Sequence, residues 1–260
     1  KYVDNYACSG ELNGLTNKLA GIGTFAHEFT HVIGLPDLYD VNYGDNYRDS
    51  RTPGNWHVMD GGSYNNEGKT PPNYSIYDKY FIGWNTPVNP GETSQEISLY
   101  APSSDLYNGY QLATSTSLLS ATSSNVVYYI ENRQQTGWDE HLPGHGMLIW
   151  QVRYNARAWQ DNAVNTSSGS PRYTIVSATG STTDIGYYAS DPFPGSYGVT
   201  SWYGLTGRSL TQISESGKVV SLTYEADATS SESYTYTIRV QLDDACDMDL
   251  YNGLYLWWWS

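Results

Sequence analysis

The stretch His27-Glu28-Phe29-Thr30-His31 constrains the fold of this chain more than any other feature of its sequence. Residues four apart lie on one face of a helix, one turn from each other, so both imidazoles can reach a single metal ion. Gly34 can end that helix in the left-handed conformation, and Pro36 prevents the helix from resuming. We therefore expect a short helix that ends near Gly34 and is stabilised by packing rather than by helix propensity.

A third candidate ligand follows the turn directly. Asp37 lies six residues after His31, and a carboxylate is an acceptable zinc ligand. A catalytic zinc also keeps an open position for water, and Glu28, between the two histidines, can face that water as a base. This is the pattern of a zinc-dependent peptidase. The alternative for Asp37 is a carboxylate that only caps the turn.

The helix also carries apolar residues near helical spacing, which predict a face buried in the core: Phe25, Phe29, Val32 and Ile33. Its N-terminus has two candidate capping residues, Thr24 and Thr16. The hydroxyl of either could accept an amide hydrogen of the first turn, and the sequence does not decide between them.

A second block, residues 56–64, resembles the methionine turn that lies beneath the zinc in metzincins. Met59 would then form a soft apolar floor under the histidine ligands; otherwise it is an ordinary core residue at a turn. Tyr64 is a candidate hydrogen-bond donor to a reacting carbonyl, although it lies further past the methionine than the tyrosine ligand of some metzincins. We expect His57 to be a core or surface histidine.

The segment Gly21–Asp40 resembles the active-site signature of the immune inhibitor A family of bacterial secreted metallopeptidases. Further blocks match the pattern of that family in consistent order: 77–84, 129–134 with 137–139, 142–150 and, more weakly, 191–195. One departure is Thr30, where the family more often has glycine. A small hydroxyl at this position should not disturb metal binding.

This resemblance implies a zinc metalloendopeptidase, a secreted or cell-surface hydrolase that cleaves peptide bonds in protein or peptide substrates. Its zinc ligands would be His27, His31 and Asp37, and Glu28 would be the general base for a zinc-activated water. The implied fold is α+β, with a zincin-like (metzincin) core that has a twisted sheet upstream of the active-site helix. Only 26 residues precede His27, too few for such a sheet. Another chain could supply the sheet, or the segment after the site could replace it, but we expect the upstream part of the same precursor to be missing.

Composition limits the partners. The formal net charge is −14, which argues against nucleic acid or an anionic membrane as partner. Few charged residues (15%) combined with 25 tyrosines, 25 glycines and 9 tryptophans are typical of an extracellular β-rich protein. No run of about 18 apolar residues predicts a membrane span. Cys8 and Cys246 could pair in an oxidising compartment or remain two thiols.

A cluster of oxygen-bearing side chains follows the metal motif: Asp40, Asn42, Asp45, Asn46 and Asp49. Calcium takes six to eight oxygen ligands, so Ca²⁺ is a second candidate cofactor, although the spacing is not that of an EF-hand. A solvated polar loop is the alternative.

Downstream, residues 75–84 predict a helix whose core-facing residues are Ile76, Tyr80 and Phe81. Short runs between Gly, Pro, Asn and Ser clusters then predict strands at 95–100, 126–133, 147–153, 173–178, 218–224 and 234–242. We expect residues 1–85 to be the C-terminal part of a catalytic domain. Residues 86–260 would be an antiparallel β-rich region, either a continuation of the peptidase unit or an accessory β-sandwich.

Three features of the β-rich region have ordinary structural explanations. Glu131 and Arg133 lie on the same side of a predicted strand, where we expect a structural pair. His141 and His145 flank a Leu-Pro-Gly sequence, and we expect exposed loop histidines rather than a second metal site. The apolar tail 254–259 predicts a strand or a binding segment.

Two other function classes remain as alternatives. One is a β-rich module that binds protein or carbohydrate, which would have no need of Glu28. The other is a catalytically silent homologue with a structural metal, which would need a fourth protein ligand to close the site. The sequence offers no compelling fourth ligand, so a zinc metallopeptidase is the favoured prediction.

Overall fold

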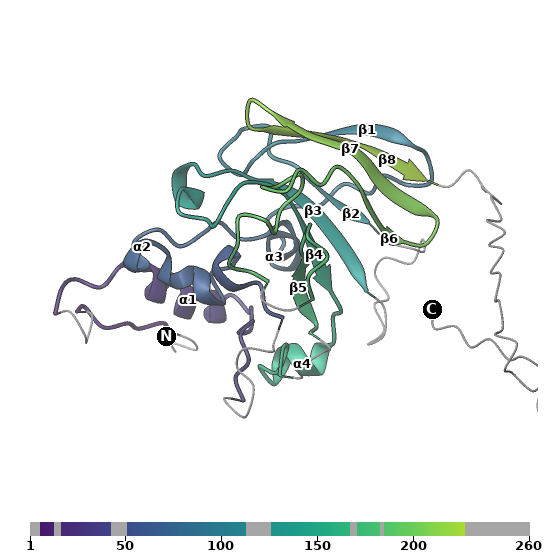
Figure 1. The fold of residues 1–260 in the computed structure, drawn as a ribbon. Helices are drawn as coiled ribbons and strands as arrows, with labels where there is room; N and C mark the ends of the chain where they lie inside the picture. The colour runs from purple at the N-terminus through teal and green to yellow at the C-terminus, as the bar shows by residue number, and fades with distance from the viewer. Residues whose placement is uncertain are drawn as a thin grey trace, which may run out of the picture. The chain divides into compact units, whose positions relative to one another are not determined.

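The computed structural model describes residues 6–12, 17–42, 51–112, 126–166, 171–182 and 185–226. All of them belong to one compact unit within residues 1–228. This unit contains a few short helices and two antiparallel sheets, which confirms the predicted α+β class (Figure 1). Within the described ranges, no helix is both long enough and apolar enough to cross a membrane.

Helix α1 (Ile22–Val32) carries the histidine motif and ends as the sequence predicts. Gly34 has φ +99°, and its amide donates to the His31 carbonyl at 3.0 Å. Gly21 is the N-cap residue and no side chain caps the helix, so the prediction of a threonine cap is wrong. Thr24 lies inside the first turn instead.

The buried side of α1 is made of small residues. A Cβ on Gly23 would lie 1.9 Å from the Ser63 carbonyl oxygen, so only glycine permits this approach. The neighbouring segment consists of a 3₁₀ turn, Gly61–Tyr64, and the single turn α2, Asn65–Gly68.

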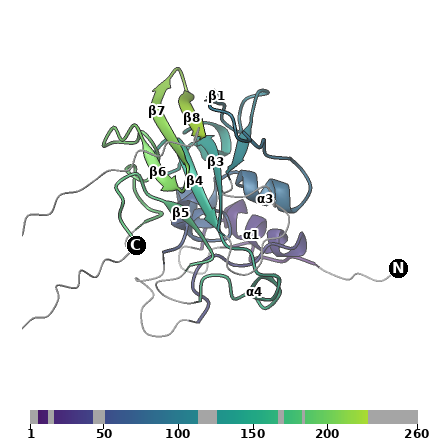
Figure 2. The same cartoon turned by 90° about the vertical axis from the view of Figure 1, so that its right-hand side faces the viewer.

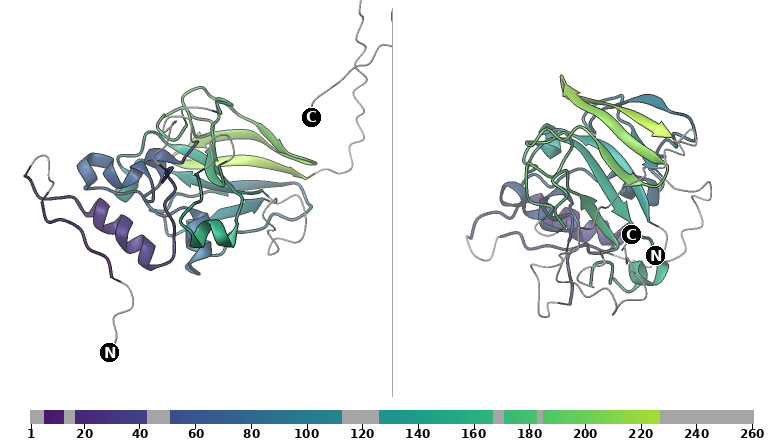
Figure 3. Two further views of the ribbon diagram at one scale, coloured as in Figure 1. Left: turned by 90° about the horizontal axis from the view of Figure 1, so that it is seen from below. Right: turned by 45° about the vertical axis from the view of Figure 1, so that its right-hand side comes forward.

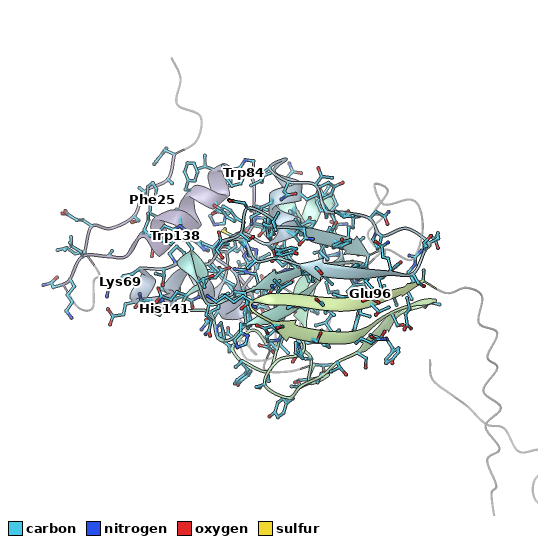
Figure 4. The ribbon with its side chains drawn as sticks, turned by 90° about the horizontal axis from the view of Figure 1, so that it is seen from above. Phe25, Lys69, Trp84, Glu96, Trp138 and His141 are labelled. Atoms are coloured by element: carbon cyan, nitrogen blue, oxygen red, sulfur yellow. The ribbon has the colours of Figure 1, made fainter. Side chains whose placement is uncertain are left out.

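The predicted core face of α1 is wrong. Phe25 and Phe29 are 45% and 44% exposed and stack on each other with 6.3 Å between ring centroids. Because the residues beside Ser63 leave room only for small side chains, the larger ones turn outward. Figure 4 shows Phe25 on α1 and Glu96 at opposite ends of the view.

The two sheets have four strands each. The first has the order β2-β3-β4-β5, with bounds Gly109–Leu112, Val127–Arg133, Gly146–Val152 and Tyr173–Val176. The second has the order β1-β8-β7-β6, with bounds Gln95–Leu99, Val219–Ala226, Arg208–Ser216 and Trp202–Leu205. They form neighbouring layers in Figures 1 and 3, with an apolar cluster between them that includes Ile149, Leu210 and Val220.

Five of the predicted strands are confirmed to within two residues at each end, as β1, β3, β4, β5 and β8. The sixth, 234–242, lies outside the described residues. Three observed strands were not predicted. β7 is rich in Ser, Thr, Gln and Glu, which do not form the apolar alternation typical of a strand. β2 and β6 are too short for such a pattern and contain glycine.

A second apolar cluster connects the segment after α1 to the first sheet. It contains Leu38 and Trp56 together with Trp150 on β4 and Tyr173 on β5. Residues on both sides of position 85 therefore share one core, and the predicted domain boundary at that position stays a prediction.

Helix α3 (Ile76–Phe81) lies beside β3 and is shorter than predicted (Figure 2). Ser75 accepts the amide hydrogen of Asp78, and the Asp78 carboxylate accepts that of Ser75, which forms a capping box. Ile76 is buried as expected, but Phe81 is 38% exposed and Tyr77 is buried in its place. The short helix turns its 76–77 edge, rather than Phe81, toward the core.

A fully buried ion cluster lies next to this helix. Arg133 contacts Glu131 at 3.4 Å and donates to both carboxylate oxygens of Asp139 at 2.9 and 2.5 Å, which confirms the structural pairing on β3. Arg133 also contacts a third residue, Asn73, because it donates to the carbonyl of Asn73 at 3.1 Å. Asp139 accepts the amide hydrogen of Asn73 at 2.8 Å.

The remaining predictions are resolved only in part. His141, labelled beside Lys69 in Figure 4, and His145 are both exposed, as predicted. Cys8 is exposed and forms no disulfide within the described residues, whereas Cys246 lies outside them. So do most of the calcium candidates (Asp45, Asn46 and Asp49) and the tail 254–259.

Candidate metal centre

The structure brings the three predicted metal ligands together. His27 Nε2 lies 3.0 Å and His31 Nε2 lies 3.3 Å from the same oxygen, Oδ1 of Asp37. All three donor atoms lie within 4.8 Å of one another, although Asp37 comes from the turn after α1. Gly34 makes this return possible, because the helix ends there and the chain doubles back under its own last turn.

Hydrogen bonds fix which nitrogen of each ring faces the cluster. His27 Nδ1 lies 2.9 Å from the carbonyl of Val58, and His31 Nδ1 lies 2.9 Å from the carbonyl of Leu35. A carbonyl can only accept, so each Nδ1 carries the hydrogen and each neutral ring turns a lone pair on Nε2 toward Asp37. Metal-bound histidines are typically oriented in this way, by an acceptor for the hydrogen on the ring nitrogen that does not bind the metal.

Asp37 contributes the third candidate donor atom, a carboxylate oxygen to which no described residue donates a hydrogen bond. Its Oδ1 is buried and accepts no well-formed hydrogen bond from the described residues. Its Oδ2 accepts from the side-chain amide of Asn162 at 2.7 Å. Three lone pairs thus converge on one point, which is unfavourable unless a proton or a cation lies between them. The donor set therefore fits zinc, which binds nitrogen and carboxylate oxygen.

The pKa values of His27, His31 and Asp37 also indicate that positive charge is favoured at this point. Burial lowers the pKa of His27, but Asp37 and the Val58 carbonyl outweigh it, so the pKa is raised above 6.5. Contact with Asp37 is the main cause of the raised pKa of His31. Burial raises the pKa of Asp37, yet His27, His31 and Asn162 bring it far below its usual range. Positive charge between the three groups is therefore favoured, whether a proton on an imidazole or a bound cation supplies it.

A cavity of about 510 Å³ opens beside the cluster. Glu28 lines it together with His27, and so does Tyr64, which is 72% exposed. Glu28 is not part of the three-donor cluster, and no fourth His, Cys, Asp or Glu of the described chain joins that cluster. A carboxylate thus lies at an open pocket next to three candidate protein ligands, an arrangement that fits a catalytic rather than a structural zinc site.

The predicted methionine turn packs behind the site. Met59 is fully buried, and its carbonyl accepts from the amide of Leu38 at 2.9 Å, next to Asp37 in sequence. His57 is buried as well: its Nδ1 accepts from the Met59 amide at 3.0 Å and its Nε2 lies 2.6 Å from Asp78. His57 and Asp78 therefore fix the segment whose Val58 carbonyl orients His27.

Thr30 has a structural role on the buried side of α1. Its hydroxyl lies 2.6 Å from the carbonyl of Ala26 and 2.6 Å from the hydroxyl of Tyr74. Tyr74 follows Asn73, which the buried ion cluster of Arg133 and Asp139 holds. The ion cluster is thus connected to α1 through the short segment Asn73-Tyr74.

Sequence reasoning missed the supporting residues of the site. Asn162, Asp78 and Tyr173 (3.1 Å from Asp78) lie far from the motif in sequence, and no spacing rule links them to it. The only signal was the capping-box pattern Ser75-x-x-Asp78 at the start of α3, which explains part of the role of Asp78.

Comparison with known proteins confirms the resemblance for one part of the chain. Residues 13–87 match the family described as "Immune inhibitor A peptidase M6, catalytic domain". A "Putative secreted metallopeptidase" from Arthroderma benhamiae is 32% identical over 92 residues, which cover 30% of this chain. The match spans 13% of the length of that relative. Asn162 lies outside the family match.

Proposed function

We propose that this chain carries the catalytic metal centre of a secreted zinc metallopeptidase that cleaves proteins. One observation carries the proposal: His27 Nε2, His31 Nε2 and Asp37 Oδ1 converge beside a pocket that Glu28 lines. The family match over residues 13–87 and the name of the Arthroderma benhamiae relative support it. We also propose that α1, the glycine turn and the methionine turn form a zincin-like core.

In this proposal His27, His31 and Asp37 hold the zinc. When bound, zinc supplies Lewis-acid chemistry, which makes water a nucleophile near neutral pH and polarises the substrate carbonyl. Glu28, one helix position after His27, accepts the proton of the attacking water and returns it to the leaving amine. The carbonyls of Val58 and Leu35 keep the rings oriented throughout.

Two further site residues belong to this proposal. Met59 forms the apolar floor behind the histidine ligands, since it is fully buried next to Val58. Tyr64 is the candidate donor to the substrate carbonyl, since it lines the same pocket as Glu28. The proposed substrate is a protein or peptide that enters this open pocket. The proposed location of the enzyme is extracellular.

The test is hydrolysis of an unstructured protein by the purified chain with its metal removed and restored. We expect a chelator to abolish cleavage and about one equivalent of Zn²⁺ to restore it. A chelator-insensitive activity would contradict the proposal. The silent-homologue alternative predicts tight zinc binding with no cleavage at any metal concentration.

A further inference from the structure

Asn162 holds Asp37 at two points. Its Nδ2 donates to Asp37 Oδ2 at 2.7 Å, and its Oδ1 accepts the backbone amide hydrogen of Asp37 at 2.7 Å. One amide side chain thus fixes both the backbone and the carboxylate of a single residue, 125 positions away in sequence. The carboxylate plane is set, and the free oxygen, Oδ1, is the one that faces His27 and His31.

The segment that carries Asn162 is itself rigidly held. Helix α4 (Ala156–Gln160) is capped by the side chain of Asn155, which accepts the amide hydrogen of Ala158 at 2.9 Å. Trp159 on this helix is 7% exposed and packs in the core cluster. Asn162 has φ +53°, a left-handed conformation that asparagine tolerates better than most residues.

A second contact ties the same segment to the residue after Asp37. Asn165 donates to the carbonyl of Leu38 at 2.7 Å and to that of Tyr173, on β5, at 2.7 Å. The 162–165 segment therefore holds the backbone at the amide of Asp37 and at the carbonyl of Leu38, while the carbonyl of Met59 accepts the Leu38 amide hydrogen between them.

We propose that Asn162 is a positioning residue of the metal centre, which makes Asp37 a one-oxygen ligand. The inference rests on the proposed zinc site and deepens it. Oδ2 already accepts from an amide donor, whereas Oδ1 accepts no hydrogen bond from the described residues, so Oδ1 is the oxygen offered to a metal. Coordination by Oδ1 alone would leave a fourth position open for water. Without this donor, Asp37 would be able to rotate, turn both oxygens toward the metal or leave it. Partners of ligand residues typically contribute about 10- to 100-fold in metal affinity.

The informative variant is Asn162→Gly. Glycine adopts φ +53° without strain, so the variant removes the amide and leaves the backbone conformation accessible. Zn²⁺ affinity is measured by competition with a chromogenic chelator, and the coordination geometry by the visible spectrum of the Co²⁺-substituted protein. We expect zinc affinity to fall about 10- to 100-fold. We also expect the cobalt bands of the four-coordinate wild-type site to weaken, as coordination by both Asp37 oxygens predicts.

Asn155→Ala is the matched control. It removes the side chain of another asparagine, at the N-cap of the neighbouring helix α4. That side chain accepts a hydrogen bond from the amide of Ala158 and is not a partner of Asp37. We expect its zinc affinity and cobalt spectrum to equal those of the wild type. The inference is overturned if Asn162→Gly retains both wild-type values, or if Asn155→Ala changes them equally, which would mean that any loosening of α4 has this effect. A wild-type protein that binds neither metal would instead overturn the proposed function.

Discussion

Replacing Glu28 with glutamine should reduce peptide hydrolysis by about 10²- to 10⁴-fold while zinc affinity stays unchanged. Glutamine has the shape of glutamate but cannot take a proton from water, so the variant isolates the general-base role. Glu28 lies outside the three-donor cluster, which is why metal binding should be unaffected. The comparison requires kcat/KM on an unstructured protein substrate and a zinc titration of both proteins.

Glu67→Gln is the control for this substitution. Glu67 is an exposed carboxylate that pairs with Lys69 at 2.7 Å. It does not line the pocket beside the three-donor cluster. Its removal should leave both hydrolysis and zinc binding at wild-type levels. If zinc-loaded Glu28→Gln cleaved at the wild-type rate, Glu28 would not be the base and the proposed mechanism would be wrong.

Replacing Arg133 with methionine should lower the free energy of unfolding by about 3–5 kcal/mol. Arg133, Glu131 and Asp139 are all buried, and the arginine is the cation that contacts both carboxylates. Methionine fills much of the same volume but leaves two buried carboxylates without that partner. Chemical unfolding of the metal-free protein, followed by tryptophan fluorescence, would measure the loss.

The matched control is Arg157→Met. Arg157 also pairs with an aspartate, Asp161 at 3.1 Å, but its side chain is 89% exposed. Exposed pairs contribute about 0–1 kcal/mol, so this variant should unfold close to the wild type. Equal stability of Arg133→Met and the wild type would show that the buried cluster does not depend on the arginine cation for its stability.

The metal motif was predictable from sequence because its geometry is local. Helical spacing determines that His27 and His31 share a face, and the glycine turn determines that Asp37 returns beneath them. The partners of these residues were not predictable in the same way. Asn162 contacts Asp37 only because the β-rich region folds back onto the turn, and a single sequence carries no signal of that contact.

The side of α1 that faces the core shows a second limit of sequence patterns. Apolar periodicity predicts that Phe25 and Phe29 are buried, yet both are about half-exposed. The buried face contains Gly23 and Thr30 instead. Close backbone approach at Ser63 requires small residues there, so residue size rather than hydrophobicity decides which face is buried. β7 was not predicted because its sequence is polar, and its pairing with β6 and β8 stabilises it as a strand.

The most direct test of the metal centre is zinc stoichiometry in the wild type and in His31→Ala, measured by elemental analysis after dialysis against a weak chelator. The proposed metal centre predicts about one zinc ion per wild-type chain and none in the variant, since His31 would supply one of three ligands. Folding of the variant is checked by its far-ultraviolet circular dichroism spectrum. Zinc retained by a folded His31→Ala protein, or a wild-type chain that binds no zinc, would contradict it.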